Sequence, residues 1–163
     1  MSERSAREVV EGITMGFAAV DSNQVREALE THDSPADVLA ALGEFGEFQE
    51  QVIDPEIVID FSAFDSALTP DAPERFHGLQ GWMEMWRLWL GAWEDYEPEL
   101  EIEELDEEHI LVTATATLKG RGSGVEVEWV TVAIWTVRDG RLVAMHNFLT
   151  REDALAALEK GLP

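Results

Sequence analysis

The chain has 163 residues, no cysteine, and 34 acidic against 11 basic side chains, for a formal net charge of -23. This length suits one domain, and a hydrophobic content of 45% supplies enough apolar side chains for a core, which excludes an acidic disordered chain. The net charge repels phosphate groups, so neither nucleic acid nor an anionic membrane surface is an expected partner. Without cysteine there are no disulfides, no thiolate zinc ligands and no cysteine nucleophile.

The first segment of the chain predicts a cytoplasmic protein. Glu8 and Glu11 interrupt any apolar run of the signal-peptide type. The stretch 12–20 is far shorter than the ~20 apolar residues that cross a membrane. Gly12 and Gly16, four residues apart, therefore favour close helix packing in a soluble domain over a membrane dimer motif. The few lysines suit a halophilic source, but a GC-rich genome also replaces lysine with arginine, so both explanations stay open.

The N-terminal third of the chain has helical periodicity. Apolar residues recur at helical spacing over residues 9–20. Ser22 is expected to cap a second helix, and Ser34 followed by Pro35 is a strong helix start, with an acid in the first turn. Gly43 counts against the continuity of that third helix.

From Pro55 onward the sequence predicts strands around one more long helix. Ile57–Phe61 is a predicted strand, residues 62–77 form a loop of the length used for lids or binding loops, and a helix runs from Gly78 to about Trp93. Period-two alternation then predicts four strands and a last helix: Tyr96–Leu105, His109–Lys119, Val125–Val137, Arg141–Leu149 and Arg151–Glu159. The fold class is therefore α+β, with helices packed on one face of a curved antiparallel sheet.

Tryptophans on the predicted 78–93 helix are the most informative feature. Trp82, Trp86, Trp89 and Trp93 fall within ~60° of arc on one helix face. Core packing explains any one of them, but four indoles in one stripe exceed what an ordinary core accepts, and aromatic walls are typical of small-molecule pockets. We expect part of the stripe to be core and part to be pocket wall. The expected ligand-binding residues are Trp82, Trp86, Trp89, Trp129, Phe61 and Met145.

Asp60 is the candidate acid or base. It lies in an otherwise apolar strand, on the side opposite Ile59 and Phe61, but the alternation does not say which side faces inward. Facing outward, Asp60 is one solvated acid among many. Facing an indole-lined cavity, it would have a raised pKa and could transfer protons at neutral pH.

The strand Val125–Val137 is apolar on both sides. Val130, Val132 and Ile134 share one face, and Trp129 and Trp135 share the other. A strand of this kind is covered on both sides, and a second subunit is the expected cover on the side without helices. This predicts a homodimer formed through the outer face of the sheet.

The remaining motifs argue against a metal site, a bound cofactor and serine chemistry. The four histidines are far apart in sequence and show no metal-ligand spacing, so no metal and no cofactor is expected. His146 and Asn147 point to opposite faces of the last strand. The Gly120–Gly124 run joins two strands and opens no helix, so it is a hairpin rather than a phosphate loop.

Several segments together resemble the SnoaL-like branch of the NTF2-like superfamily: Phe76–Trp82, Gly120–Val127, Val132–Val143 and Arg151–Leu158. The resemblance covers roughly residues 22–162, which predicts one domain at 22–163 preceded by a helical extension at 1–21. It implies a cone in which N-terminal helices wrap a curved antiparallel sheet around an apolar cavity. It also implies dimerisation through the outer sheet face, as in many relatives.

The resemblance carries some catalytic positions and lacks others. Asp60 falls where ketosteroid isomerases keep their base, and Trp86 where they keep a pocket aromatic. Their second pocket acid would fall at Ala133, and Tyr96, the only tyrosine, cannot be their oxyanion donor. Polyketide cyclases carry an acid near the end of the strand that resembles 141–149. Here that position looks like Asn147, and an amide cannot shuttle a proton.

Two hypotheses for the function remain open. The first is an acid/base enzyme of isomerase, cyclase or hydrolase type that acts on a hydrophobic small molecule, neutral or weakly cationic, with Asp60 as base and Asn147 orienting the substrate. The alternative is a non-catalytic dimeric module that binds such a ligand in the same cavity, where Asp60 has a structural role.

Overall fold

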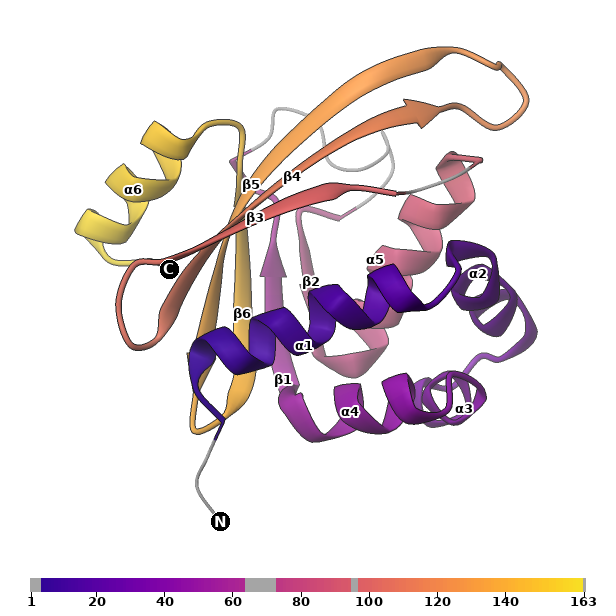
Figure 1. The fold of residues 1–163 in the computed structure, drawn as a ribbon, viewed down its shortest axis with the longest axis horizontal. Coiled ribbons are helices and arrows are strands. Elements are labelled where there is room, and N and C mark those ends of the chain that lie inside the picture. The colour runs from indigo at the N-terminus through magenta and orange to yellow at the C-terminus, as the bar shows by residue number, and fades with distance from the viewer. Residues whose placement is uncertain (1–3, 64–72, 95–96, 163) are drawn as a thin grey trace.

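A computed structural model of the protein describes residues 4–63, 73–94 and 97–162, with the backbone alone at 17–19. Within these ranges the chain forms six helices and a six-stranded curved sheet, an α+β arrangement as predicted (Figure 1). The helices precede the sheet in sequence except for α5, which stands between the second and third strands, and α6, which follows the last strand.

Four helices form the N-terminal third, and their caps explain where they begin. They are α1 (Ala6–Ala19), α2 (Ser22–Thr31), α3 (Pro35–Ala41) and α4 (Glu44–Val52). Ser34 caps α3 with Pro35 in its first turn, as predicted, whereas the cap of α2 is Asp21 and not Ser22. Gly43 adopts a φ of 62°, a conformation that L-residues rarely adopt, and separates α3 from α4.

The sheet contains one pairing that the sequence did not predict. Its strands are β1 (Ile53–Asp60), β2 (Arg75–His77), β3 (Glu99–Glu104), β4 (His109–Lys119), β5 (Glu126–Arg138) and β6 (Arg141–Phe148), in the order β2-β1-β6-β5-β4-β3. All neighbours are antiparallel except β1 and β6, which run parallel. The sheet is therefore mixed: β1, from the first half of the chain, adds to the antiparallel strands β3 to β6 by pairing in parallel with β6.

The first two strands differ from the predicted ones in extent. β1 begins at Ile53 rather than Ile57, and Pro55 lies where its register with β6 shifts, a position at which a strand tolerates proline. β2 is three residues long and lies in the segment predicted as a loop, pairing with the end of β1. The rest of that predicted loop, residues 64–72, lies outside the described residues.

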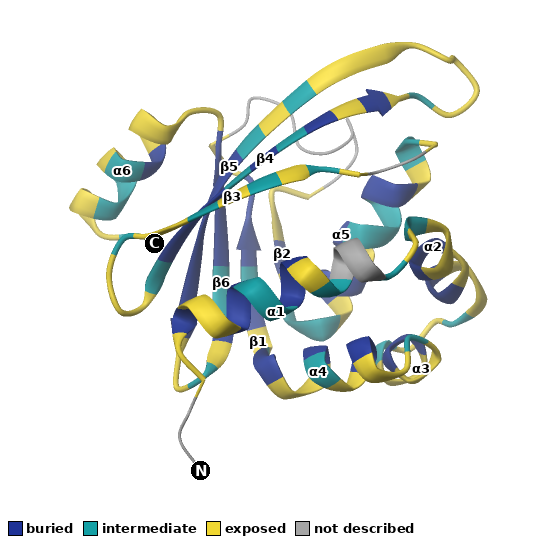
Figure 2. Ribbon diagram, viewed as in Figure 1, coloured by how far each residue is buried: buried dark blue, intermediate teal, exposed yellow. Residues whose placement is uncertain are grey.

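Helices cover the two faces of the sheet unequally (Figure 1). On the inner face, α1 packs against β3 to β6 and α5 (Gly78–Ala92) packs against β1 and β2. On the outer face, α6 (Arg151–Lys160) packs against β5 and β6. Figure 2 shows the buried residues concentrated between the inner face and the helices, where side chains from α1 to α5 and the strands form the main core.

The outer face has a smaller apolar cluster under α6. Val132 and Ile134 pack there with Leu111, Phe148 and Ala154 of α6. The sequence predicted a second subunit as the cover for Val132 and Ile134, but α6 supplies it. Val130, next on the same face of β5, is 49% exposed.

Gly12 and Gly16 allow α1 to pack closely on α4. A Cβ added at Gly12 would lie 2.3 Å from the ring of Phe48, and one at Gly16 would lie 2.3 Å from the ring of Phe45. The two glycines therefore serve helix packing within the domain, as the sequence predicted. No helix in the described ranges has both the length and the apolar character needed to cross a membrane.

Two arginines tie α2 and α5 together through their helix ends. Arg26 of α2 is buried and donates to the carbonyl oxygens of Leu90, Trp93 and Glu94 at the C-terminal end of α5, at 2.9 to 3.1 Å. Arg87 of α5 donates in turn to Leu29 and His32 at the C-terminal end of α2. Each guanidinium thus satisfies carbonyls that the end of a helix leaves without partners.

Replacing Arg26 should test how much this arrangement stabilises the fold. Arg26→Met keeps an apolar side chain of similar length but leaves buried carbonyl groups without a donor. We expect the free energy of unfolding, measured by urea denaturation, to fall by about 2–4 kcal/mol. The control is Arg121→Met on the exposed β4–β5 hairpin, where we expect a change below about 0.5 kcal/mol. Equal effects at the two positions would contradict the role given to Arg26.

Candidate functional site

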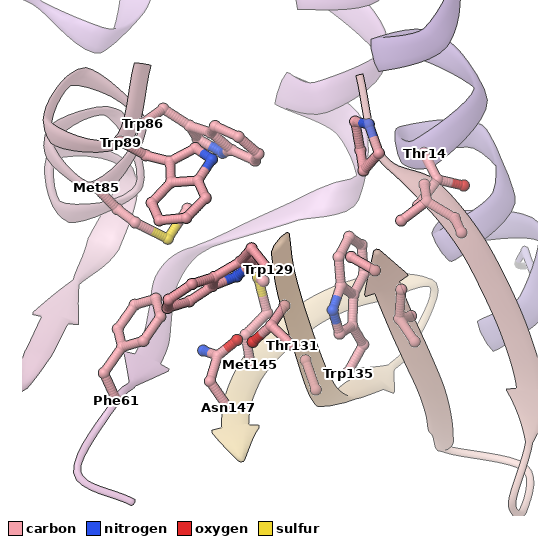
Figure 3. Close-up of a pocket in the computed structure, with 15 residues that line it drawn as sticks. Thr14, Phe61, Met85, Trp86, Trp89, Trp129, Thr131, Trp135, Met145 and Asn147 are labelled. Carbon is pink, nitrogen blue, oxygen red and sulfur yellow. The ribbon is translucent and has the colours of Figure 1, made fainter. Parts of the chain in front are cut away.

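An apolar cavity lies between α5, α1 and the inner face of the sheet (Figure 3). Its volume is about 110 Å³. The strands contribute mostly small or apolar side chains to its wall, including Leu100, Val112, Ala114 and Ala133. The cavity is therefore a pocket on the concave side of the sheet, bounded on the opposite side by α5.

The indole stripe of α5 divides between core and cavity, as the sequence predicted for the stripe as a whole. Trp86 and Trp89 line the cavity. Trp82 does not; it is 1% exposed, and its Nε1 donates to Oε1 of Gln49 at 2.9 Å. Trp93, beyond the last residue of α5, packs edge-on against Trp89 with ring centroids 5.7 Å apart. The structure thus places the expected ligand-binding residue Trp82 in the core.

Trp129 closes the cavity from the opposite side. It lies on β5, lines the cavity, and its ring centroid is 5.3 Å from that of Trp89. Backbone hydrogen bonds hold this part of the sheet to the end of α5: Glu94 N donates to Lys119 O at 2.9 Å, and Arg121 N donates to Ala92 O at 3.1 Å. The indole wall therefore continues from α5 onto the β4–β5 hairpin.

Phe61, Met145 and Asn147, three more of the candidate site residues, also line the cavity. Phe61 follows the end of β1, and Met145 and Asn147 lie two residues apart on β6, so all three project from the inner face. With Trp86, Trp89 and Trp129, the structure brings together six of the eight predicted site residues. The exceptions are Trp82 and Asp60.

Asp60 is buried, but its carboxylate is not among the described groups that line the cavity. Its position on β1 puts it on the outer face, opposite Phe61. Oδ1 accepts from the backbone N–H of Ser62 at 2.7 Å, and Oδ2 accepts from Nε of Arg75 at 3.0 Å. The carboxylate is therefore engaged in a local turn and an ion pair with β2.

The electrostatics of Asp60 differ from those of a general base. Burial by itself raises the pKa of the carboxyl, but the hydrogen bonds from Ser62 and Arg75, with the positive charge of Arg75, together outweigh burial and hold the pKa below its usual value. A lowered pKa makes the carboxylate a weaker proton acceptor at neutral pH. Neither its position nor its pKa supports the predicted role as a base, which stays a prediction.

The backbone of Asp60 nevertheless touches the site. Nδ2 of Asn147 donates to the carbonyl oxygen of Asp60 at 3.2 Å, between neighbouring strands. Asn147 is 5% exposed, so this bond fixes the amide at the cavity wall. Ala133, where the family resemblance would put a second acid, also lines the cavity and pairs with Asn147 across β5 and β6.

Several lining residues were missed from the sequence. Thr14 reaches the cavity from α1, in the segment predicted to precede the domain, and its hydroxyl donates to Val10 O at 2.9 Å within its own helix. Thr131 and Trp135 lie on the same face of β5 as Trp129, so the alternation of that strand could have found them. Nε1 of Trp135 is buried and has no hydrogen-bond partner among the described residues.

No described lining residue carries a side chain that ionises near neutral pH. Across the described ranges, no three His, Asp or Glu side chains are placed to hold a metal ion. Asp60 is also the one buried carboxylate in the described part of the chain. The remaining described acids therefore lie at or near the surface, where water solvates them.

Sequence comparison identifies the family. The family described as the SnoaL-like domain matches residues 25–145, most of the chain. The chain belongs to this family, which confirms the resemblance seen in its segments. No curated protein sequence matches the chain.

Solved structures with similar folds agree with this assignment. An NTF2-like protein from Burkholderia xenovorans LB400 superposes with a TM-score of 0.57 at 19% identity, over 93% of this chain and 95% of the other. A candidate SnoaL-like polyketide cyclase from Jannaschia sp. CCS1 gives 0.54 at 15% identity over the whole of both chains. An LEH-like epoxide hydrolase from M. tuberculosis gives 0.51 at 14% identity, over 99% of this chain and 91% of the other. At these identities the likeness shows the fold alone.

The lowered pKa of Asp60 makes a prediction about stability and pH. Because the carboxyl is more acidic in the folded protein, its ionisation stabilises the fold above the unfolded-state pKa of about 3.9, and this contribution is lost as the pH falls through the folded-state value. We expect Asp60→Asn to lower Tm at pH 7, and the difference from the wild type to shrink as the pH falls below about 4.

The matched control is Asp33→Asn, a change at an exposed carboxylate. Its Tm should follow the wild type at every pH in the same calorimetric series. An Asp60→Asn variant that is more stable than the wild type at pH 7 would contradict the ion pair, because a desolvated base with a raised pKa gains stability when its charge is removed.

Proposed function

We propose that the protein binds an uncharged, largely apolar small molecule in the cavity under α5. The observation that supports this most is the lining: indoles, aliphatic side chains, two threonines and one amide, with no ionisable side chain among the described residues. A concave apolar surface with a few polar groups is the usual form of a small-molecule site. An ionised ligand would lose its hydration there without gaining a charged partner.

Charge outside the cavity supports the same class of ligand. The net charge of -23 repels anions before they reach the site. Trp86, Trp89 and Trp129 offer flat faces to rings or to branched hydrocarbon. Rigid, neutral, ring-containing molecules such as terpenoids, steroids or aromatic polyketides are the ligands that this wall fits.

We favour ligand binding over acid/base catalysis for this chain. Proton transfer needs a titratable group within hydrogen-bond reach of the substrate, and the described cavity wall contains none. The similar structures include a protein described as an epoxide hydrolase and one described as a candidate polyketide cyclase, so the fold is compatible with catalysis in other chains. Acid/base chemistry with Asp60 as base is the alternative that the experiment below must separate.

Two dyes of similar shape test the charge and the polarity of the site. N-phenyl-1-naphthylamine is neutral, whereas 1-anilinonaphthalene-8-sulfonate carries a sulfonate. We expect the neutral dye to bind and quench the tryptophan emission, and the sulfonate to bind at least about tenfold more weakly. Tighter binding of the sulfonate would contradict the proposal.

Variants on α5 separate the cavity from general stability. Trp89→Leu removes a wall indole and should weaken binding of the neutral dye about tenfold. Leu90→Ala truncates a buried side chain of the same helix that does not line the cavity, so it should lower Tm without changing the affinity.

Terpenoids, steroids and aromatic polyketides should then be incubated with wild type and Asp60→Asn. Binding without turnover in both proteins supports a binding module, and turnover that is lost in Asp60→Asn supports the enzyme.

A homodimer through the outer sheet face is a second proposal, about assembly. Val130 is exposed beside the cluster that α6 covers, and the carboxylates of Glu126 and Glu128 lie on the same face of β5. Two copies packed through this face would bring like charges together, so we expect association to strengthen with salt. Sedimentation equilibrium in low and high salt measures it, and a monomer under both conditions would contradict the proposal.

A further inference from the structure

Two polar side chains lie close together on the otherwise apolar floor of the cavity. Thr131 of β5 and Asn147 of β6 both line it. Because Ala133 pairs with Asn147, Thr131 is the diagonal neighbour of Asn147 on the same face of the two antiparallel strands. Figure 3 shows the Thr131 hydroxyl and the Asn147 amide in the same part of the cavity, below the α5 indoles.

The orientation of the Asn147 amide is determined by its neighbour. Nδ2 donates to the carbonyl oxygen of Asp60, which cannot accept from Oδ1. The amide therefore cannot flip without losing this bond, and Oδ1 must point away from Asp60. Within the described ranges nothing donates to Oδ1, although Asn147 is only 5% exposed. Asn147 thus presents an unused acceptor to the cavity.

The Thr131 hydroxyl is the complementary group. Among the described residues it has no hydrogen-bond partner, and its oxygen can both donate and accept. The other lining threonine differs, because the Thr14 hydroxyl donates to the carbonyls of Val10 and Glu11 in its own helix. Of the two threonines in the cavity wall, Thr131 is the one whose donor remains available to a ligand.

We propose that Thr131 and Asn147 form a subsite that recognises a hydroxyl group on the ligand. The inference rests on the proposed binding of a neutral apolar molecule and names the polar group that such a molecule carries. A hydroxyl donates its hydrogen to Oδ1 of Asn147 and accepts the hydrogen of the Thr131 hydroxyl. One atom of the ligand thereby satisfies both protein groups.

Other polar groups match the subsite less well. A ketone oxygen accepts from Thr131 but leaves Oδ1 of Asn147 facing a second acceptor. A carboxylate repels Oδ1, and none of the described lining residues offers it a cation. An ammonium group would leave the Thr131 hydrogen without an acceptor. A saturated hydrocarbon fills the space but leaves both groups unpaired. Sites built to hydrogen-bond a hydroxyl discriminate in this way against analogues that lack it.

Three molecules with one carbon skeleton test the inference: menthol, menthone and p-menthane. We expect wild-type protein to bind menthol about fivefold more tightly than menthone, measured by quenching of tryptophan emission. Thr131→Val keeps the shape of the side chain and removes the hydroxyl. It should weaken the binding of menthol about fivefold and leave the affinity for p-menthane unchanged. The control is Thr115→Val, on β4 and on the outer face, which should change neither affinity.

The outcomes separate this inference from the proposed function. Menthone binding as tightly as menthol, or a Thr131→Val variant that still prefers menthol, would overturn the hydroxyl subsite and leave the cavity proposal standing. Failure of all three molecules while N-phenyl-1-naphthylamine still binds overturns the subsite alone. If that dye fails as well, both proposals fall.

A second measurement needs no variant to fold. In proton–nitrogen correlation spectra of wild-type protein, the side-chain amide of Asn147 should shift when menthol is added and shift less with p-menthane, because only menthol bonds to its oxygen. Equal shifts with both molecules would overturn the inference.

Discussion

Arg26 of α2 binds the C-terminal end of α5, and Arg87 of α5 binds the C-terminal end of α2. This pair of contacts helps to position the helix that covers the cavity. The last carbonyls of a helix have no partner within the helix, and here each guanidinium supplies donors to the C-terminal end of the other arginine's helix. Since α5 carries Trp86 and Trp89, these bonds hold the indole wall in place at one end. Together with the packing of α5 on β1 and β2, they set the position of α5 over the sheet.

The residues at the end of β1 serve different roles on the two faces of the sheet. Phe61, the residue after β1, lines the cavity on the inner side. On the outer side Asp60 forms an ion pair with Arg75, and the backbone carbonyl of Asp60 fixes the amide of Asn147. Asp60 is thus connected to the site through its main chain rather than its carboxylate. Any residue at position 60 would offer this backbone carbonyl, so the contact with Asn147 does not depend on the carboxylate.

Local patterns predicted most of the fold, and long-range pairings were beyond them. Alternation between clear turns gave β4 its observed limits, His109–Lys119, and Ser34 with Pro35 marked the start of α3. β2, three residues long, is too short for any period to show. The parallel pairing of β1 with β6 was not predicted, because alternation describes the faces of a strand but not its neighbour.

The site divides in the same way. Helical spacing placed the tryptophans of residues 82–93 on one face, but it does not say what each of them meets. Trp82 packs in the core and donates to Gln49, whereas Trp86 and Trp89 line the cavity. Alternation put Asp60 opposite Phe61 without saying which faced inward. Thr14 could not be found, since threonines are common and nothing in the sequence brings α1 to the cavity.

The β4–β5 hairpin extends beyond the body of the protein (Figure 1). Residues 121–128 at its tip are all exposed. Trp129, which lines the cavity, comes directly after this segment. Lengthening or shortening the tip would leave the packed core untouched, because loops tolerate such changes better than buried elements. A change in the length of the tip would therefore alter the rim of the cavity beside Trp129 and leave the folded body as it is.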